Sequence, residues 1–150
     1  MTAEDLAARL NLAPHPEGGF YRETYRAADG ACTAIFYLLP AGAKSNLHRI
    51  KSDELWHHHL GGALEIVEIG SGGRVETTVL GPDLEKGEVL QKVVAAGRWF
   101  GARPRPGTEW ALAGCTVAPA FRFADFELAR RAELLKTYPA AAAEILALTD

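Results

Sequence analysis

Hydrophobic and polar positions alternate along many short segments of the chain, a pattern typical of β-strands with one buried face. Glycine and proline residues separate these segments at intervals of roughly 8–12 residues. Gly61 and Gly62 favour a hairpin at the end of the longest segment, and residues 71–73 favour a second tight turn. The segments that we expect to be strands are residues 20–26, 32–39, 48–62, 63–69, 74–80, 88–95, 98–103, 109–118 and 120–126. The pattern therefore predicts an all-β domain, either a sandwich or a jelly roll.

Helical patterns are confined to the two ends of the sequence. Thr2 and Asp5 stand three residues apart just before a pair of leucines, which indicates a capped short helix. After residue 126 the spacing of the leucines changes to a helical period, and Pro139 interrupts this period. We therefore expect one short helix after residue 126 and a further helical turn or two over residues 140–148.

Length and composition predict a single domain spanning residues 1–150, with 48% hydrophobic and 23% charged residues. The net charge of −3 offers no electrostatic reason to expect nucleic acid or an anionic membrane as a partner. The sequence has neither a long apolar run nor a basic, apolar secretory signal, so we expect a cytoplasmic protein. Cys32 and Cys115 lie far apart, and we expect both to be reduced, buried thiols.

Four of the five histidines fall within one short segment. Because side chains alternate along a strand, Glu54, Trp56 and His58 are predicted to share one face. Such residues are unusual in a hydrophobic core but common in the lining of a binding pocket. His57 and His59 are predicted to lie on the opposite face, where they would meet solvent, a surface metal ion or a partner chain.

The spacing of His48, Glu54 and Gly61 resembles the first conserved motif of the cupins, which contains two histidines, a glutamate and a glycine. His48 matches the first histidine of the motif, and Glu54 and Gly61 match its glutamate and glycine. Ile50 stands where the motif has its second histidine. In the second cupin motif the glycine is matched by Gly97, whereas Phe100 replaces the histidine.

Four separated stretches also resemble, in the same order, a small bacterial and eukaryotic cupin family of unknown function within the RmlC-like cupins. These stretches cover nearly the whole chain and are residues 15–26, 47–62, 80–88 and 114–139. The resemblance implies a double-stranded β-helix, that is, a jelly-roll barrel, with short terminal helices and a homodimeric assembly. It implies no particular activity, because this fold carries many chemistries.

Cupin metal sites use three histidines and one carboxylate inside the barrel. Ile50 and Phe100 are apolar at two of these four positions, so we expect no metal cofactor. The alternative is a metal-dependent cupin, a dioxygenase or isomerase, that uses His48, Glu54 and another histidine. A further alternative is a non-catalytic protein that binds or senses a small molecule.

The metal-free hypothesis resembles the sugar epimerases of this superfamily, in which a histidine removes a proton beside a carbonyl and a tyrosine returns one. His48 is the expected base, with Glu54 as the acid that sets its tautomer. Tyr21 is the expected proton donor, with Tyr25 and Tyr37 as alternatives. The leading hypothesis is therefore binding of a small polar metabolite, such as a sugar or nucleotide sugar, followed by epimerisation or isomerisation without a metal.

Other side chains are expected to bind the substrate. Trp56 and Trp99 could supply a stacking platform for a flat ring, and Arg22 or Lys44 would hold an anion. The strand that carries Arg22 is expected to serve the pocket or the partner subunit. The predicted substrate-binding residues are Arg22, Glu23, Trp56, His58, Trp99 and Phe100.

Overall fold

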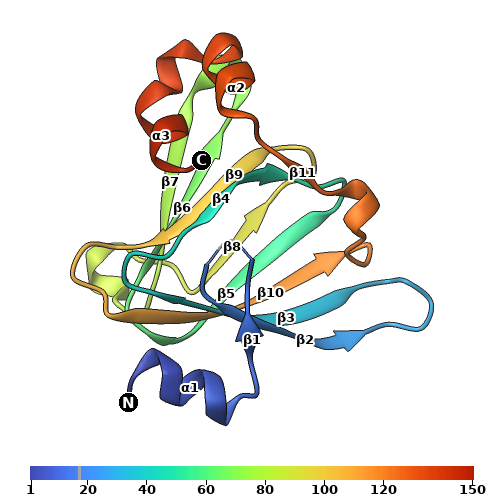
Figure 1. Ribbon diagram of the computed structural model, residues 1–150, viewed down its shortest axis with the longest axis vertical. Coiled ribbons are helices and arrows are strands. Elements are labelled where there is room, and N and C mark those ends of the chain that lie inside the picture. The colour runs from blue at the N-terminus through green and yellow to red at the C-terminus, as the bar shows by residue number, and fades with distance from the viewer. Residues whose placement is uncertain (17) are drawn as a thin grey trace.

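Two antiparallel sheets face each other and form a barrel in the computed structural model, which describes residues 1–16 and 18–150 (Figure 1). The first sheet contains, in spatial order, β1 (Ala13–Pro14), β2 (Phe20–Arg26), β3 (Thr33–Pro40), β10 (Trp110–Ala118), β5 (Asp53–Gly61) and β8 (Gln91–Val94). The second sheet contains β11 (Glu127–Leu128), β4 (Ser45–Arg49), β9 (Trp99–Pro104), β6 (Leu64–Ile69) and β7 (Val75–Leu80). From β3 onward the chain crosses between the sheets at every connection except the β6–β7 hairpin. This is the predicted all-β jelly roll.

The helices lie on opposite sides of the barrel, with α1 (Ala3–Arg9) against the first sheet and α2 (Arg131–Thr137) and α3 (Ala142–Ala147) against the second (Figure 1). The predicted cap of α1 is confirmed: the Asp5 amide donates to Thr2 Oγ1, and the Thr2 amide donates to the Asp5 carboxylate. Short 3₁₀ turns complete the connections: η1 (Ser71–Gly73), η2 (Leu84–Lys86), η3 (Phe123–Asp125) and η4 (Pro139–Ala141). Within the described residues, no helix is long and apolar enough to cross a membrane.

Hydrophobic side chains form three separate packed layers. The first lies between the two sheets and includes Trp56 and Phe100. The second joins the outer face of the second sheet to α2 and α3, and it includes Trp99. The third joins α1 to the outer face of the first sheet through Leu6 and Leu38. Each sheet is therefore covered on its outer face by terminal helices, which leaves the space inside the barrel for a site.

Three expectations about the chain path were wrong. Residues 48–62 do not form one strand, because β4 and β5 belong to different sheets. The hairpin expected at Gly61 is likewise a crossing from β5 in the first sheet to β6 in the second. Residues 120–126 form η3 and its flanks rather than a strand, and the following helix begins at Arg131. The phenylalanines of this segment pack against one another instead of alternating across a sheet, with ring centroids 5.1–6.5 Å apart.

Candidate functional site

A cavity of about 780 Å³ lies inside the barrel. Most of its wall is aromatic or aliphatic and includes Tyr21, Tyr37, Trp56, Phe121 and Phe126. Apart from its tyrosines, the titratable and charged side chains that line it, among the residues that the structure describes, are His15, Glu23, Arg26, His48, Glu54 and Arg122. A volume of this size is typical of a small-molecule pocket that encloses most of its ligand.

His48 reaches this cavity from β4, and its exposed fraction is 9%. Its Nδ1 lies 2.8 Å from the backbone oxygen of Asn46. Because a carbonyl oxygen only accepts hydrogen bonds, Nδ1 carries the ring proton and Nε2 carries the lone pair. Burial lowers the pKa of His48 to about 4, although the hydrogen bond to Asn46 acts in the opposite direction. The ring is therefore neutral near neutral pH.

Glu54 reaches the cavity from β5 in the opposite sheet and is also buried. Burial raises the pKa of Glu54 to about 7, and a hydrogen bond with the thiol of Cys115 opposes this shift. A carboxyl with this pKa gains and loses its proton near neutrality, as a general acid or base must. The sequence predicted that Glu54 would set the tautomer of His48, but the Asn46 backbone oxygen performs that task.

Trp56 lines the cavity next to Glu54 in the same strand and is 1% exposed. Its Nε1 has no hydrogen-bond partner among the residues that the structure describes. An unpaired buried N–H is destabilising. The indole therefore offers a donor for a ligand acceptor as well as a face for stacking.

His15 is a cavity residue that the sequence reasoning missed. Its ring centroid lies 5.0 Å from that of Tyr21 and 5.3 Å from that of Tyr37. Burial lowers the pKa of His15 below its usual range. The only available signal was the unusual His-Pro stretch before Gly18 and Gly19, because the position of a loop residue depends on what it packs against.

Tyr21 and Glu23, both predicted site residues, line the cavity wall. Glu23 forms an ion pair of 2.7 Å with Arg26, and both side chains are substantially exposed. Arg122 also lines the cavity and is exposed. The fixed charges are therefore gathered at the solvent-exposed part of the cavity wall, whereas His48 and Glu54 are buried.

Arg22, His58 and Trp99 are predicted binding residues that lie outside the cavity. Arg22 Nε donates to the backbone oxygen of Leu10 over 2.9 Å. His58 Nε2 donates to the backbone oxygen of Gly62 over 2.9 Å. Trp99 packs on the opposite face of the second sheet beneath α2 and α3. None of these three side chains lines the cavity wall, so they are removed from the candidate site.

Phe100 and Lys44 also differ from their expected roles. Phe100 packs in the core against His48 and does not itself line the cavity. Lys44 forms an ion pair of 3.1 Å with Asp150. On the outer face of the first sheet, the parallel rings of His57 and His59 lie 6.4 Å apart. His57 contacts Gln91 and Thr116 there, away from the cavity.

The donor set of the cavity does not fit a cupin metal centre. Ile50 lines the wall where the first motif has its second histidine, and Phe100 stands where the second motif has its histidine. Over residues 1–16 and 18–150, no group of three or more histidine, cysteine or acidic side chains is placed to hold a metal ion. His48 and Glu54 are the motif positions that keep a polar side chain.

The jelly-roll barrel, with His48 and Glu54 facing its interior from the positions of the first motif, defines a cupin. The chain belongs to the cupin superfamily, in the family described as DUF985. The model of that family matches residues 4–129. The same barrel occurs in a Shewanella oneidensis protein of known crystal structure, which is 38% identical with a TM-score of 0.92. That match covers 100% of this chain and 98% of the other. A hypothetical protein from Leishmania major is 33% identical, with a TM-score of 0.92 and 99% of each chain covered.

More distant matches show the fold alone. Oxalate decarboxylase from Bacillus subtilis is 15% identical with a TM-score of 0.63, and the match covers 90% of this chain and 36% of that enzyme. No curated protein matches the sequence. The family and the fold are thus established, and the activity has to be argued from the site itself.

Proposed function

We propose that this cupin binds a small ring-containing metabolite, such as a sugar or nucleotide-sugar derivative, and moves a proton on it without a metal ion. The observation that carries the proposal is that two buried titratable side chains, His48 and Glu54, reach one aromatic-walled cavity from opposite sheets. Burial raises the pKa of Glu54 to about 7 and lowers that of His48 to about 4. Paired titratable groups with opposite shifts are a hallmark of acid–base sites.

The roles that this environment supports differ from those expected from sequence. Glu54 is the group whose pKa matches proton transfer near neutrality, so it removes or returns the proton beside a ligand carbonyl. His48 stays neutral, and its Nε2 accepts a hydrogen bond from a ligand hydroxyl. Tyr21 lines the same wall and supplies a second proton donor. Glu54 takes the proton from the carbon beside the carbonyl, and the electron pair of that C–H bond moves onto the carbonyl oxygen as an enolate. Epimerisation follows when Tyr21 protonates the same carbon from the opposite face, and exchange with water then returns both side chains to their starting protonation states. Isomerisation of a hydroxy-carbonyl ligand follows when Glu54 instead returns its proton to the neighbouring carbon of the enediol.

The aromatic wall supports a ring-shaped ligand. Tyr37 and Trp56 lie with ring centroids 6.2 Å apart, and both line the cavity. The C–H face of a sugar and the flat face of a nucleobase both pack well on such rings. The Trp56 N–H, which has no hydrogen-bond partner in the part of the chain that the structure describes, would bind a ligand oxygen.

Solvent-deuterium exchange tests the proposal directly. The protein is incubated in D₂O with a panel of keto sugars and nucleotide sugars, and NMR follows loss of the C–H signal beside the carbonyl. We expect exchange with at least one member of the panel, slowed by roughly 10²-fold or more in Glu54→Gln. His58→Gln is the matched control, because His58 lies on the same strand but outside the cavity. Equal exchange in wild type and Glu54→Gln would contradict the proposal.

A binding role without turnover is the second candidate, and Trp56 is the observation that favours it. The buried Trp56 N–H, which has no acceptor among the described residues, would recognise a ligand oxygen whether or not the ligand reacts. In this case one member of the panel, at 100 times its dissociation constant, would raise the free energy of unfolding by about 2.7 kcal/mol. No deuterium would be incorporated into that ligand. Trp56→Phe would weaken the binding of that ligand, because it removes the N–H donor while keeping an aromatic ring.

A further inference from the structure

β4 contains a β-bulge immediately before His48. In its pairing with β9, Ser45 lies opposite Ala102 and His48 lies opposite Phe100, so β4 has one extra residue between these pairs. Gly101 lies against this bulge, where an added Cβ would be 2.7 Å from the Ser45 oxygen. Bulges beside functional sites re-aim a side chain, and here the re-aimed residue is His48.

The backbone of the bulge residue Leu47 forms its hydrogen bonds with residues outside β9. The Leu47 amide donates to the backbone oxygen of Leu148 over 2.8 Å, and the Ala129 amide donates to the Leu47 oxygen over 2.9 Å. The preceding carbonyl, that of Asn46, accepts the Nδ1–H of His48. The backbone turn that aims this carbonyl at His48 is therefore held by residues about 80 and 100 positions further along the chain.

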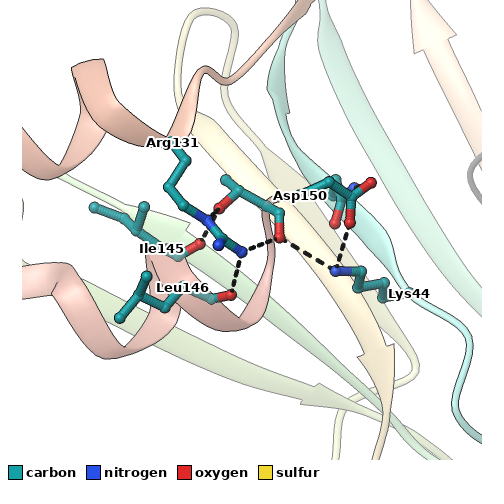
Figure 2. Close-up of polar contacts among 7 residues, drawn as sticks. Lys44, Arg131, Ile145, Leu146 and Asp150 are labelled. Atoms are coloured by element: carbon teal, nitrogen blue, oxygen red, sulfur yellow. Dashed lines mark hydrogen bonds and ion pairs between the residues drawn. The ribbon is translucent and has the colours of Figure 1, made fainter.

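The segment 148–150 is itself clamped from two sides (Figure 2). From α2, the guanidinium of Arg131 donates to Thr149 Oγ1 over 2.8 Å, to the Thr149 backbone oxygen over 2.6 Å and to the Leu146 oxygen over 3.0 Å. From the β4 side, Lys44 Nζ lies 3.1 Å from the Asp150 carboxylate and 3.3 Å from the Thr149 oxygen.

The clamp also reaches the bulge through a side chain. Asn46 is 3% exposed, and its Nδ2 donates to the Asp150 carboxylate over 3.1 Å. Asn46 therefore contacts the segment 148–150 through its side chain and His48 through its backbone. Thr149 is 2% exposed, so these contacts are largely shielded from water.

We propose that Arg131 is a positioning residue for His48, which acts through the segment 148–150 and the bulge at residues 46–47. By holding Thr149 it fixes Leu148 against the Leu47 amide, and the bulge then keeps the Asn46 carbonyl in line with His48 Nδ1. These contacts together determine which ring nitrogen of His48 presents its lone pair to the cavity. The inference depends on the proposed function only in taking His48 as a residue of the site.

The tautomer of His48 tests this proposal without any ligand. Side-chain ¹⁵N NMR distinguishes a protonated ring nitrogen from an unprotonated one in wild type and in Arg131→Ala. We expect a single Nδ1–H tautomer in wild type, whereas in Arg131→Ala both ring-nitrogen resonances shift toward averaged values. Arg131→Lys, which keeps one charged donor, should restore part of the wild-type pattern.

Two control variants separate positioning from a general loss of stability. Arg130→Ala removes the exposed neighbour of Arg131, which pairs with Glu133 at 3.5 Å. Glu144→Gln loosens α3 from the barrel by weakening its ion pair with Arg103, and it leaves the clamp at Thr149 intact. Both should keep the wild-type nitrogen resonances, even where the thermal midpoint falls. If Arg131→Ala proves unfolded, Thr149→Val removes a single hydroxyl from the same clamp and serves in its place.

The outcomes distinguish this proposal from the proposed function. Unchanged His48 resonances in folded Arg131→Ala, or equal changes in the two controls, would overturn the positioning role. An Nε2–H tautomer in wild type would overturn it as well. A shifted tautomer in Arg131→Ala, together with a failed deuterium-exchange screen, would support the positioning role and reject only the catalytic proposal.

Discussion

The ring of Phe100 lies against that of His48, with centroids 4.2 Å apart and planes inclined by 49°. Phe100 also meets Trp56 edge to face, with centroids 6.5 Å apart. An apolar ring thus fills the position from which the second cupin motif supplies a histidine. The contact supports the neutral state of His48, because an aromatic neighbour cannot solvate an imidazolium edge as water does.

Restoring both missing histidines should create a metal site. We expect Ile50→His combined with Phe100→His to bind about one divalent metal ion per chain, because His48 and Glu54 already stand at the other two motif positions. Metal content measured by mass spectrometry on untagged protein checks this prediction. Stoichiometric metal in the wild type that is lost in His48→Ala would contradict the proposal that the site works without a metal.

The free energy of unfolding should depend on pH because of Glu54. Burial raises its pKa from the usual 4.5 to about 7, so in this range the folded protein keeps a proton that the unfolded chain releases. Stability contributed by this group is present below pH 4.5 and is lost as the pH rises through 7, by about 3 kcal/mol in total. Urea unfolding of wild type and Glu54→Gln across this range measures the difference between them. Parallel curves would show that the Glu54 carboxyl is not buried in its acid form.

His48 should produce a dependence of the opposite sign. Burial lowers its pKa from the usual 6.5 to about 4. Between these pH values the unfolded chain therefore binds a proton at His48, whereas the folded protein does not. The stabilising contribution is present above pH 6.5 and is lost as the pH falls through 4, by about 3 kcal/mol relative to His48→Gln. NMR titration of the His48 ring gives an independent check. A midpoint near 6.5 in the folded protein would refute this prediction.

Gly61 should tolerate substitution far less well than Gly87. The two glycines have nearly equal φ values, +82° and +81°. A Cβ on Gly61 would lie 2.5 Å from the Trp110 backbone oxygen, whereas a Cβ on Gly87 would meet nothing within 4 Å. We expect Gly87→Ala to cost roughly 1–2 kcal/mol through backbone strain alone and Gly61→Ala roughly 2 kcal/mol more. Chemical unfolding measures both, and equal losses would mean that the crossing at Gly61 is not tightly packed.

Local patterns predicted the strands well, because alternation and turn residues act over only a few positions. The strand expected at residues 63–69 is β6, Leu64–Ile69, and that expected at residues 74–80 is β7, Val75–Leu80. The crossings between sheets could not be predicted in this way. A pair of glycines such as Gly61 and Gly62, with Gly61 at a φ of +82°, suits a hairpin and a change of sheet equally well, and only the partner strand, β10 for β5, decides between them.

The same limit applies to the site. His48 and Glu54 were predicted from cupin spacing and Trp56 from strand alternation, and all three line the cavity. Tyr21 was predicted from the resemblance to the epimerases and Glu23 from its place in an early strand, and both line the same wall. Trp99 was wrongly included with its neighbour Phe100, since adjacent strand residues face opposite sides and hydrophobicity alone does not show which side is inward. The contact between Asn46 and His48 depends on a bulge, and a bulge has no signature in residue type here.

The clamp on β4 has a consequence for the order in which the protein assembles. Residues 45–49 are translated early, yet the Leu47 amide finds its partner only at Leu148, and β11 pairs with β4 from residues 127–128. Contacts so distant in sequence close large loops and slow folding. We therefore expect the barrel wall that carries His48 to be among the last parts to acquire its native geometry. A nascent chain that has not yet emerged beyond residue 148 would hold most of the cavity wall without a correctly aimed histidine.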